Sequence, residues 1–218
     1  MYVPASNAEH RPEVLFDYIE AHPLAALVTA SSAGMVATHL PLVLDRARGP
    51  FGTLAGHIAR ANPQSAQARD GDEALVIFSG DDAYVSPSYY ASKARDGKVV
   101  PTWNYVAVHA YGPIRFVAEP VALRSHLETL TRHHEAGRPR AWAVSDAPAS
   151  YIERMLGAIV GVEIEIARLE GKWKMSQNRS AEDVDGVIAG LASSADERER
   201  AVAEIVRARR GASRTDTP

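Results

Sequence analysis

Short apolar runs separated by turn signals fill the first half of the chain, and this succession constrains the fold more than any other feature. The clearest turn is Ser31-Ser32-Ala33-Gly34, which separates two apolar runs and predicts a hairpin with a loop of about four residues. Residues 74–79 (ALVIFS) are apolar on both faces, which predicts a central strand. The predicted strands are residues 24–30, 35–44, 52–56, 74–79, 106–117 and 159–167.

Helical patterns lie mostly after these strands. Residues 80–98 are polar and rich in Ser, Tyr, Gly and Lys, which predicts a loop, and a disordered tail is expected after Gly211. Antiparallel strands with helices inserted late predict a mainly antiparallel β fold with peripheral helices (α+β), built as a small barrel. We expect one domain over 1–190, followed by a C-terminal helix and tail over 191–218. The predicted helices are residues 10–21, 62–69, 120–135, 148–157, 181–191 and 195–210.

Composition narrows the function. The chain has 218 residues, of which 46% are hydrophobic, and a formal charge of -3, which gives no general attraction to nucleic acid or to an anionic membrane. It has no cysteine, which excludes disulfides and cysteine nucleophiles and is compatible with the cytoplasmic location expected here. The first residues, Met1-Tyr2-Val3-Pro4, do not resemble a secretory signal, and no apolar run approaches the roughly 18 residues of a membrane span.

A polar segment with phosphate-binding chemistry follows the third predicted strand. It reads Gly56-His57-Ile58-Ala59-Arg60-Ala61-Asn62-Pro63 and leads into a predicted helix. Cations and N–H donors bind phosphate, ideally at a helix N-terminus, so His57, Arg60 and Asn62 are candidate ligands. A strand-to-helix turn with a solvated arginine is the alternative explanation.

Two further polar segments each place a tryptophan beside amide, hydroxyl or ammonium groups. They are Val99-Val100-Pro101-Thr102-Trp103-Asn104-Tyr105 and Lys172-Trp173-Lys174-Met175-Ser176-Gln177-Asn178. Indole has a flat apolar face and one N–H donor, and an asparagine both donates and accepts, so these groups suit a heteroaromatic ring. Together with the phosphate candidates they indicate a phosphorylated aromatic cofactor. An interface tryptophan and a solvated turn are the respective alternatives.

Other polar residues form no specific pattern. His39, His57 and His109 lie in or beside predicted strands, but their spacing does not support a metal site, so no metal is expected and structural roles are preferred. There is no Gly-rich nucleotide-binding loop and no nucleophile elbow. Four residues of the polar excursion either line a pocket or belong to a mobile surface loop: Tyr84, Tyr89, Tyr90 and Lys93.

In combination, the motifs resemble the FMN-binding negative transcriptional regulator family, often called PaiB-like proteins. The resemblance covers the chain to about Gly190 and implies a split β-barrel related to pyridoxamine-phosphate oxidases, built as a homodimer with FMN at the subunit interface. One departure is Gln64-Ser65 after Asn-Pro, where the family often has an aromatic residue, so altered packing over the cofactor is expected there. The matching stretches are residues 1–4, 38–42, 56–63, 84–90, 100–105 and 172–178, of which the last two are the most specific.

The resemblance implies a set of cofactor residues but no catalytic acid or base. Flavin chemistry often needs none from the protein, because the cofactor carries the electrons. The expected cofactor residues are Thr38, His39 and Leu40 with their strand backbone at the isoalloxazine edge; His57, Arg60 and Asn62 at the phosphate; Trp103 and Asn104, from the partner subunit or beside the ring; and Lys172, Ser176 and Gln177 near the ring or ribityl chain.

Three functions remain open at this stage. The first is an FMN-binding regulator that acts on transcription directly or through a protein partner, the second a flavin oxidoreductase with a small substrate, and the third a split-barrel protein that binds haem. A basic stripe would favour the first, an open pocket over the flavin ring the second, and a histidine in a wide apolar cleft the third. The only cationic cluster is Arg207, Arg209, Arg210 and Arg214, and neighbouring glutamates dilute it, so weak DNA binding is expected.

Overall fold

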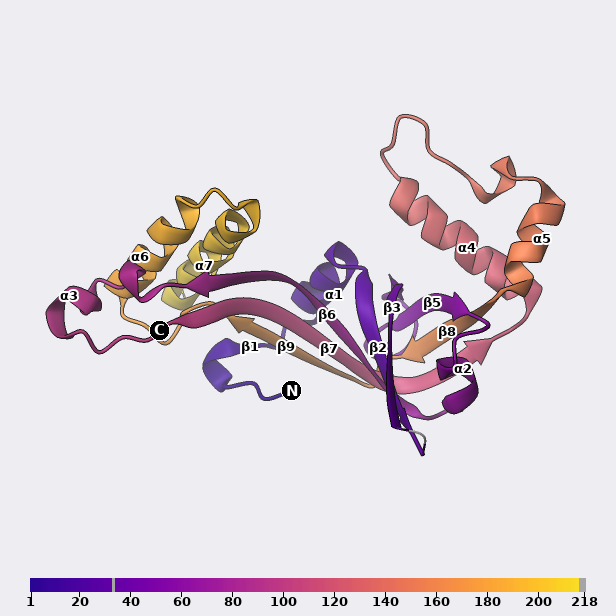
Figure 1. Cartoon of the computed structure of the whole chain (residues 1–218), viewed down its shortest axis with the longest axis horizontal. Coiled ribbons are helices and arrows are strands. Elements are labelled where there is room, and N and C mark those ends of the chain that lie inside the picture. Colours follow the sequence, from indigo (N-terminus) through magenta and orange to yellow (C-terminus); the bar gives the residue numbers. More distant parts are fainter. Residues whose placement is uncertain (33, 216–218) are drawn as a thin grey trace. The chain divides into compact units, whose positions relative to one another are not determined.

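Antiparallel strands dominate the structure, a computed structural model that describes residues 1–32 and 34–215, with side chains to residue 211 (Figure 1). No helix within these residues is long and apolar enough to cross a membrane. The strands are β1 (Ala8–Glu9), β2 (Leu24–Ser31), β3 (Gly34–Pro41), β4 (Val43–Asp45), β5 (Thr53–Ala59), β6 (Glu73–Val85), β7 (Thr102–Val117), β8 (Ile159–Glu165) and β9 (Arg168–Lys174). The helices are α1 (Pro12–Ala21), α2 (Gln64–Gln67), α3 (Ser92–Asp96), α4 (Pro120–Glu135), α5 (Ala149–Gly157), α6 (Ala181–Ala192) and α7 (Glu197–Thr215), with 3-10 turns η1 (Ala5–Asn7), η2 (Pro87–Tyr89) and η3 (Val144–Asp146).

The chain divides into two compact units. The barrel unit consists of Pro12–Phe78 and His109–Leu169, and the terminal unit consists of Met1–Arg11, Ser79–Val108 and Glu170–Pro218. Strands β6 and β7 contribute residues to both, because each passes a unit boundary.

The sheet of the barrel unit curls so that β3, at one end, lies against β5, near the other end. Its strands follow one another in the order β3-β2-β6-β7-β8-β5-β4, and the first and last of them are separated in sequence only by Leu42. Alternate residues point inward, and Leu27, Leu54, Val76 and Val162 are fully buried. The predicted barrel is therefore confirmed.

Helices α4 and α5 of the barrel unit match their predicted ranges closely. Both begin beside a proline, Pro120 in the first turn of α4 and Pro148 just before α5, where the missing N–H costs no hydrogen bond. The two helices and the segment between them share a small apolar cluster. Its buried members are Leu123, Val144, Ile152 and Leu156.

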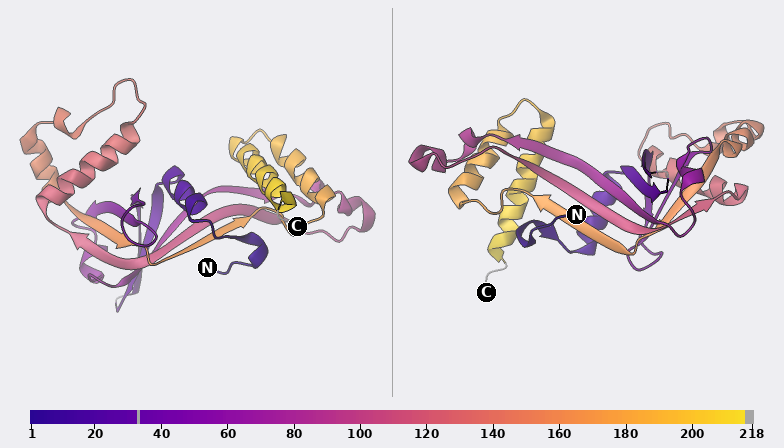
Figure 2. Two further views of the ribbon diagram at one scale, coloured as in Figure 1. Left: turned by 180° about the vertical axis from the view of Figure 1, so that it is seen from behind. Right: turned by 60° about the horizontal axis from the view of Figure 1, so that its bottom comes forward.

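The terminal unit joins three distant parts of the sequence. Strand β9 pairs with β7 and with β1, where Ala8 lies opposite Lys172. Helices α6 and α7 lie side by side (Figure 2). Val202 and Val206 of α7 are fully buried.

The polar excursion over residues 80–98 differs from its prediction as a loop. Residues 80–85 continue β6, and the rest forms η2 and α3. A Cβ atom at Gly190 of α6 would lie 2.3 Å from the ring of Tyr89, so glycine permits the close packing of this tyrosine on the helix. The backbone N–H and the hydroxyl of Ser92 both donate to Asp183 at 2.9 Å. These contacts anchor the excursion on α6, in place of a mobile loop.

The ends of two helices also differ from their predicted positions. Helix α2 has four residues where eight were predicted, and α7 continues to Thr215, past the expected start of the tail at Gly211. The predicted hairpin is present, with Ser31 opposite Gly34. Ala33 and residues 216–218 of the predicted loop and tail lie outside the described residues.

Candidate functional site

The predicted cofactor residues fall into one group in each unit. The group in the barrel unit is Thr38, His39, Leu40, His57, Arg60 and Asn62. The group in the terminal unit is Trp103, Asn104, Lys172, Ser176 and Gln177.

Thr38 and Asn62 meet in the barrel unit, although they come from different sequence motifs. The Asn62 side chain donates from Nδ2 to Thr38 Oγ1 at 2.9 Å, and its Oδ1 accepts the backbone N–H of Gln64 at 2.9 Å. Asn62 thus accepts the N–H of the first residue of α2, whose cap residue is Pro63, and four residues provide too short a helix for a strong dipole. The Thr38 hydroxyl accepts this bond and keeps its own hydrogen for another acceptor.

Arg60 follows β5 and is tied to the end of α5. Its Nε donates to the Gly157 carbonyl and its Nη2 to the Ile159 carbonyl, both at 2.9 Å. These bonds fix the guanidinium plane. Nη1 has no partner among the described residues, so a cationic donor remains for a ligand.

His57 pairs with a residue that the sequence did not single out. Its Nδ1 lies 3.1 Å from Nε2 of His126 on α4. Burial lowers the pKa of His57, and burial together with the charge of His57 lowers the pKa of His126 to about 4. At neutral pH His57 is therefore a neutral donor or acceptor, and not the cation that the phosphate prediction implied.

The remaining barrel residues differ in exposure. His39 is exposed on β3, whereas Leu40 is buried. Gln64, the departure from the family pattern, is fully buried, and its Nε2 donates to the Leu27 carbonyl at 3.3 Å and to Thr29 Oγ1 at 3.0 Å. Its side chain therefore joins α2 to β2 inside the unit.

In the terminal unit, Lys174 connects the two tryptophan motifs. Its ammonium group donates to Thr102 Oγ1 at 2.5 Å and to the Trp103 carbonyl at 2.7 Å. Burial lowers the pKa of Lys174. Two segments that lie far apart in sequence therefore meet, as the motifs indicated.

Asn104 and Ser176 form a second link between these motifs. Ser176 Oγ donates to Asn104 Oδ1 at 3.1 Å, and both side chains are buried. Ser176 has a φ of 63°, which is uncommon for a residue with a side chain. Asn104 Nδ2 is buried without a partner among the described residues, which leaves a donor unused.

The other three candidates of the terminal unit have different surroundings. Lys172 donates to the Tyr2 carbonyl at 3.1 Å and lies over the Tyr105 ring at 5.0 Å. The Gln177 amide donates to the Trp173 carbonyl and accepts the Met175 N–H, so it is occupied within its own turn. Trp103 is 53% exposed, which leaves an indole face accessible.

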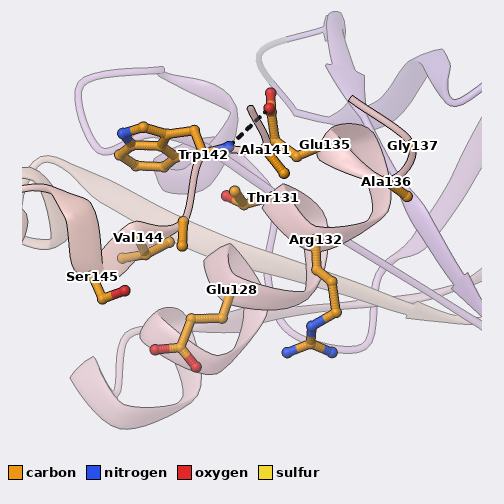
Figure 3. A pocket seen from close by; sticks show the side chains of 11 residues that line it. Glu128, Thr131, Arg132, Glu135, Ala136, Gly137, Ala141, Trp142, Val144 and Ser145 are labelled. Carbon is orange, nitrogen blue, oxygen red and sulfur yellow. Dashed lines mark hydrogen bonds between the residues drawn. The ribbon is translucent and has the colours of Figure 1, made fainter. Parts of the chain in front are cut away.

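A pocket of about 470 Å³ lies beside the second half of α4 (Figure 3). Trp142 forms part of its wall, and the backbone N–H of Trp142 donates to the Glu135 carboxylate at 3.0 Å. Thr131, Glu128 and Arg132 also line it, but none of the predicted cofactor residues does. The sequence contains no motif over these residues, and an isolated tryptophan, Trp142, is the only feature that could have indicated a pocket there.

His109 and Tyr90, which were also candidates from the sequence, each contact a neighbouring side chain. His109 Nδ1 lies 3.4 Å from the Tyr111 hydroxyl. Tyr90 is buried under the guanidinium of Arg179, at 4.7 Å from the ring centre. Within the described residues, no group of three or more His, Asp or Glu side chains is arranged to hold a metal ion.

Comparison with known proteins connects these residues to a family. Residues 1–168 match the family model described as "Putative FMN-binding domain". An uncharacterized protein of Emericella nidulans is 37% identical over 244 residues, which cover 96% of this chain and 97% of that protein. The protease synthase and sporulation protein PAI 2 of Bacillus subtilis is 29% identical over 206 residues, which cover 94% and 96%.

Solved structures agree on the fold. An FAD and heme binding protein from Mycobacterium smegmatis superimposes with a TM-score of 0.56 at 18% identity, over 84% of this chain and 80% of that one. A flavocytochrome from Azotobacter vinelandii has a TM-score of 0.56 at 16% identity, over 89% and 74%. The fold is a split β-barrel, as predicted.

Proposed function

We propose that this chain, which belongs to the FMN-binding, PaiB-like family, binds FMN as a homodimer. The flavin lies at the subunit interface in this proposal. FMN supplies the electron chemistry, and the protein binds and orients it. A cytoplasmic location is part of the proposal, because a chain without cysteine needs no oxidising compartment.

The observation that carries the proposal is a pair of unused donors, one on Arg60 just after β5 and one on Thr38 of β3. Arg60 donates from Nε and Nη2, so its cationic Nη1 is left for a ligand. The Thr38 hydroxyl accepts a hydrogen bond from Asn62, so its own hydrogen is left to donate. A phosphate monoester needs such donors, and charge-assisted bonds from arginine are the strongest of them. In chemistry, the donor set therefore fits the FMN phosphate.

The test compares FMN with riboflavin, which lacks the phosphate. Arg60→Ala should weaken FMN binding by roughly ten- to a hundred-fold and riboflavin binding little, as measured by fluorescence titration. The riboflavin reference is needed because Arg60 also donates to Gly157 and Ile159, so the variant disturbs local structure as well. Arg69→Ala, at an exposed arginine of the same unit, is the matched control. Equal losses for both flavins would exclude the phosphate contact.

The homodimer has its own support and its own test. Met35 on β3 is 77% exposed and Leu24 on β2 is 65% exposed, and a partner subunit would cover such apolar side chains. A flavin bound at the interface must tighten the dimer, so FMN should lower the dimer dissociation constant in sedimentation experiments. A monomer mass at micromolar concentration with FMN bound would refute the interface site.

Regulation, if it occurs, is proposed to act through a protein partner and not through direct DNA contact. The C-terminal cationic cluster is largely neutralised: Arg207 pairs with Glu204, Arg209 with Glu9, and Arg210 with Asp185. The side chain of Arg214 lies outside the described residues. Paired arginines offer little charge for phosphate neutralisation. The haem alternative is not favoured, because no histidine among the described residues lines the pocket beside α4.

A further inference from the structure

The pair formed by His57 and His126 has a geometry that restricts its protons. The rings come from β5 and α4, cross at 70° and have centroids 5.3 Å apart, with 3.1 Å between Nδ1 of His57 and Nε2 of His126. Within the described residues neither of the two remaining ring nitrogens has a hydrogen-bond partner. One nitrogen of each ring is therefore committed and the other is available.

A single hydrogen must lie between the two facing nitrogens. Both pKa values are lowered by burial, so both rings are neutral at neutral pH. In one arrangement His126 donates from Nε2, and His57 then carries its hydrogen on Nε2. In the other, His57 donates from Nδ1 and its Nε2 becomes a bare acceptor, which an anion would repel. The choice between these arrangements decides what His57 can bind.

Intrinsic chemistry favours the first arrangement. It places both rings in the Nε2–H tautomer, which the free imidazole side chain prefers, whereas the second requires the less stable tautomer of both. No carboxylate holds His126 in the other form, because Glu163, whose charge is felt by His126, is engaged by Arg48 at 2.6 Å and by Arg115 at 2.5 Å.

We propose that His126 is a positioning residue, which donates to His57 and so fixes the His57 Nε2–H as a donor to the FMN phosphate. This inference rests on the proposed function and adds to it a residue outside the recognised motifs. His57 contributes as a neutral donor in this arrangement, beside the cationic Arg60 that follows it by three residues.

Three variants of α4 test the inference through the FMN and riboflavin affinities. His126→Leu should weaken FMN binding roughly tenfold or more and leave riboflavin binding unchanged. His126→Gln should retain most of the FMN affinity, because its amide can donate to His57 Nδ1. His133→Leu, at an exposed histidine of the same helix, should change neither. Equal weakening of both flavins by His126→Leu would overturn the proposal.

Nitrogen-15 NMR of the protein without flavin supplies a readout that a merely structural contact would not move. His57 should be in the Nε2–H tautomer in the wild type and in His126→Gln, and should become a mixture in His126→Leu. A Nδ1–H tautomer of His57 in a protein that binds FMN would overturn the positioning role alone. Failure of the wild type to bind FMN would refute the proposed function, and the phosphate contact with it.

Discussion

Replacing Arg209 with alanine should destabilise the protein far more than replacing its neighbour Arg207. The Arg209 side chain is 18% exposed, donates to the Glu9 carboxylate at 2.6 Å and lies 4.8 Å from the ring centre of Trp173. The Glu9 side chain is only 4% exposed. Arg207 is 51% exposed and pairs with the exposed Glu204, so it provides a matched control on the same helix.

The size of the stability loss depends on the hydrogen bonds that the Glu9 carboxylate retains in the variant. Breaking a buried ion pair costs about 3–5 kcal/mol when the remaining charge has no other partner. Glu9 retains two bonds from the Arg11 guanidinium, at 2.9 and 2.7 Å, and two backbone N–H donors at 3.0 Å. The loss should therefore be smaller, and with the cation–π contact to Trp173 we expect about 2–3 kcal/mol. Arg207→Ala should stay within about 0.5 kcal/mol.

The effect should depend on pH in a defined direction. Hydrogen bonds from Arg11, and then from Arg209, lower the pKa of Glu9 from 4.5 to about 2. A carboxylate whose pKa is lowered by folding stabilises the folded state at any pH above its pKa in the unfolded chain. This stabilisation is lost as the pH falls from about 4.5 towards 2. The difference between wild type and Arg209→Ala should thus be full at pH 7 and shrink below pH 4.5.

Urea denaturation followed by far-UV circular dichroism at fixed protein concentration measures these differences. A double-mutant cycle with Glu9→Gln isolates the pair, since Arg209→Ala should cost less when the carboxylate is already absent. Equal losses for Arg209→Ala and Arg207→Ala, or a difference that grows in acid, would refute the reasoning.

Other expectations follow from the same contacts. Gly190→Ala should lower the melting temperature by several degrees, because its Cβ would overlap Tyr89, whereas Gly211→Ala meets no atom within 4 Å and should not lower it, as a thermal scan would show. Asn62→Ala should cost about 1 kcal/mol in urea denaturation, because the backbone N–H of Gln64 and the hydroxyl of Thr38 lose a partner. In a mobility-shift assay the protein should bind DNA no tighter than roughly 10⁻⁶ M at physiological salt, and nanomolar, sequence-selective binding would contradict the neutralised cluster.

Helices that are specified by apolar periodicity and by prolines at their starts could be predicted from the sequence. Helices α4 and α5 have apolar periodicity and prolines at their starts, so their ranges were predicted closely. Gly80, Asp81 and Asp82 interrupt the apolar pattern of β6, yet the strand continues because its backbone pairs with β7. Strand β9 was missed for a similar reason: charged residues occupy much of its length, and its identity comes from pairing with distant strands.

In the candidate site too, residues recognisable by their chemistry could be predicted, and contacts between distant segments could not. Motif chemistry made Arg60 and Asn104 candidates, because guanidinium and amide groups suggest ligand contacts from their residue type alone. It could not find His126, since the partner of His57 is 69 residues away and a single histidine on a helix has no distinguishing pattern. Nor could it show that the Gln64 side chain is buried beside Thr29, because burial is decided by the packing of β2 against α2.

The discontinuous terminal unit has a consequence for synthesis on the ribosome. All strands of the barrel unit have been made once Leu169 emerges, so that unit can close while translation continues. The terminal unit must wait longer, because Arg209 of α7, which pairs with Glu9 of β1, is translated well after Leu169. A nascent chain that stalls in this interval would expose the face of α6 against which α7 lies, and exposed apolar surface of this kind is bound by chaperones and promotes aggregation.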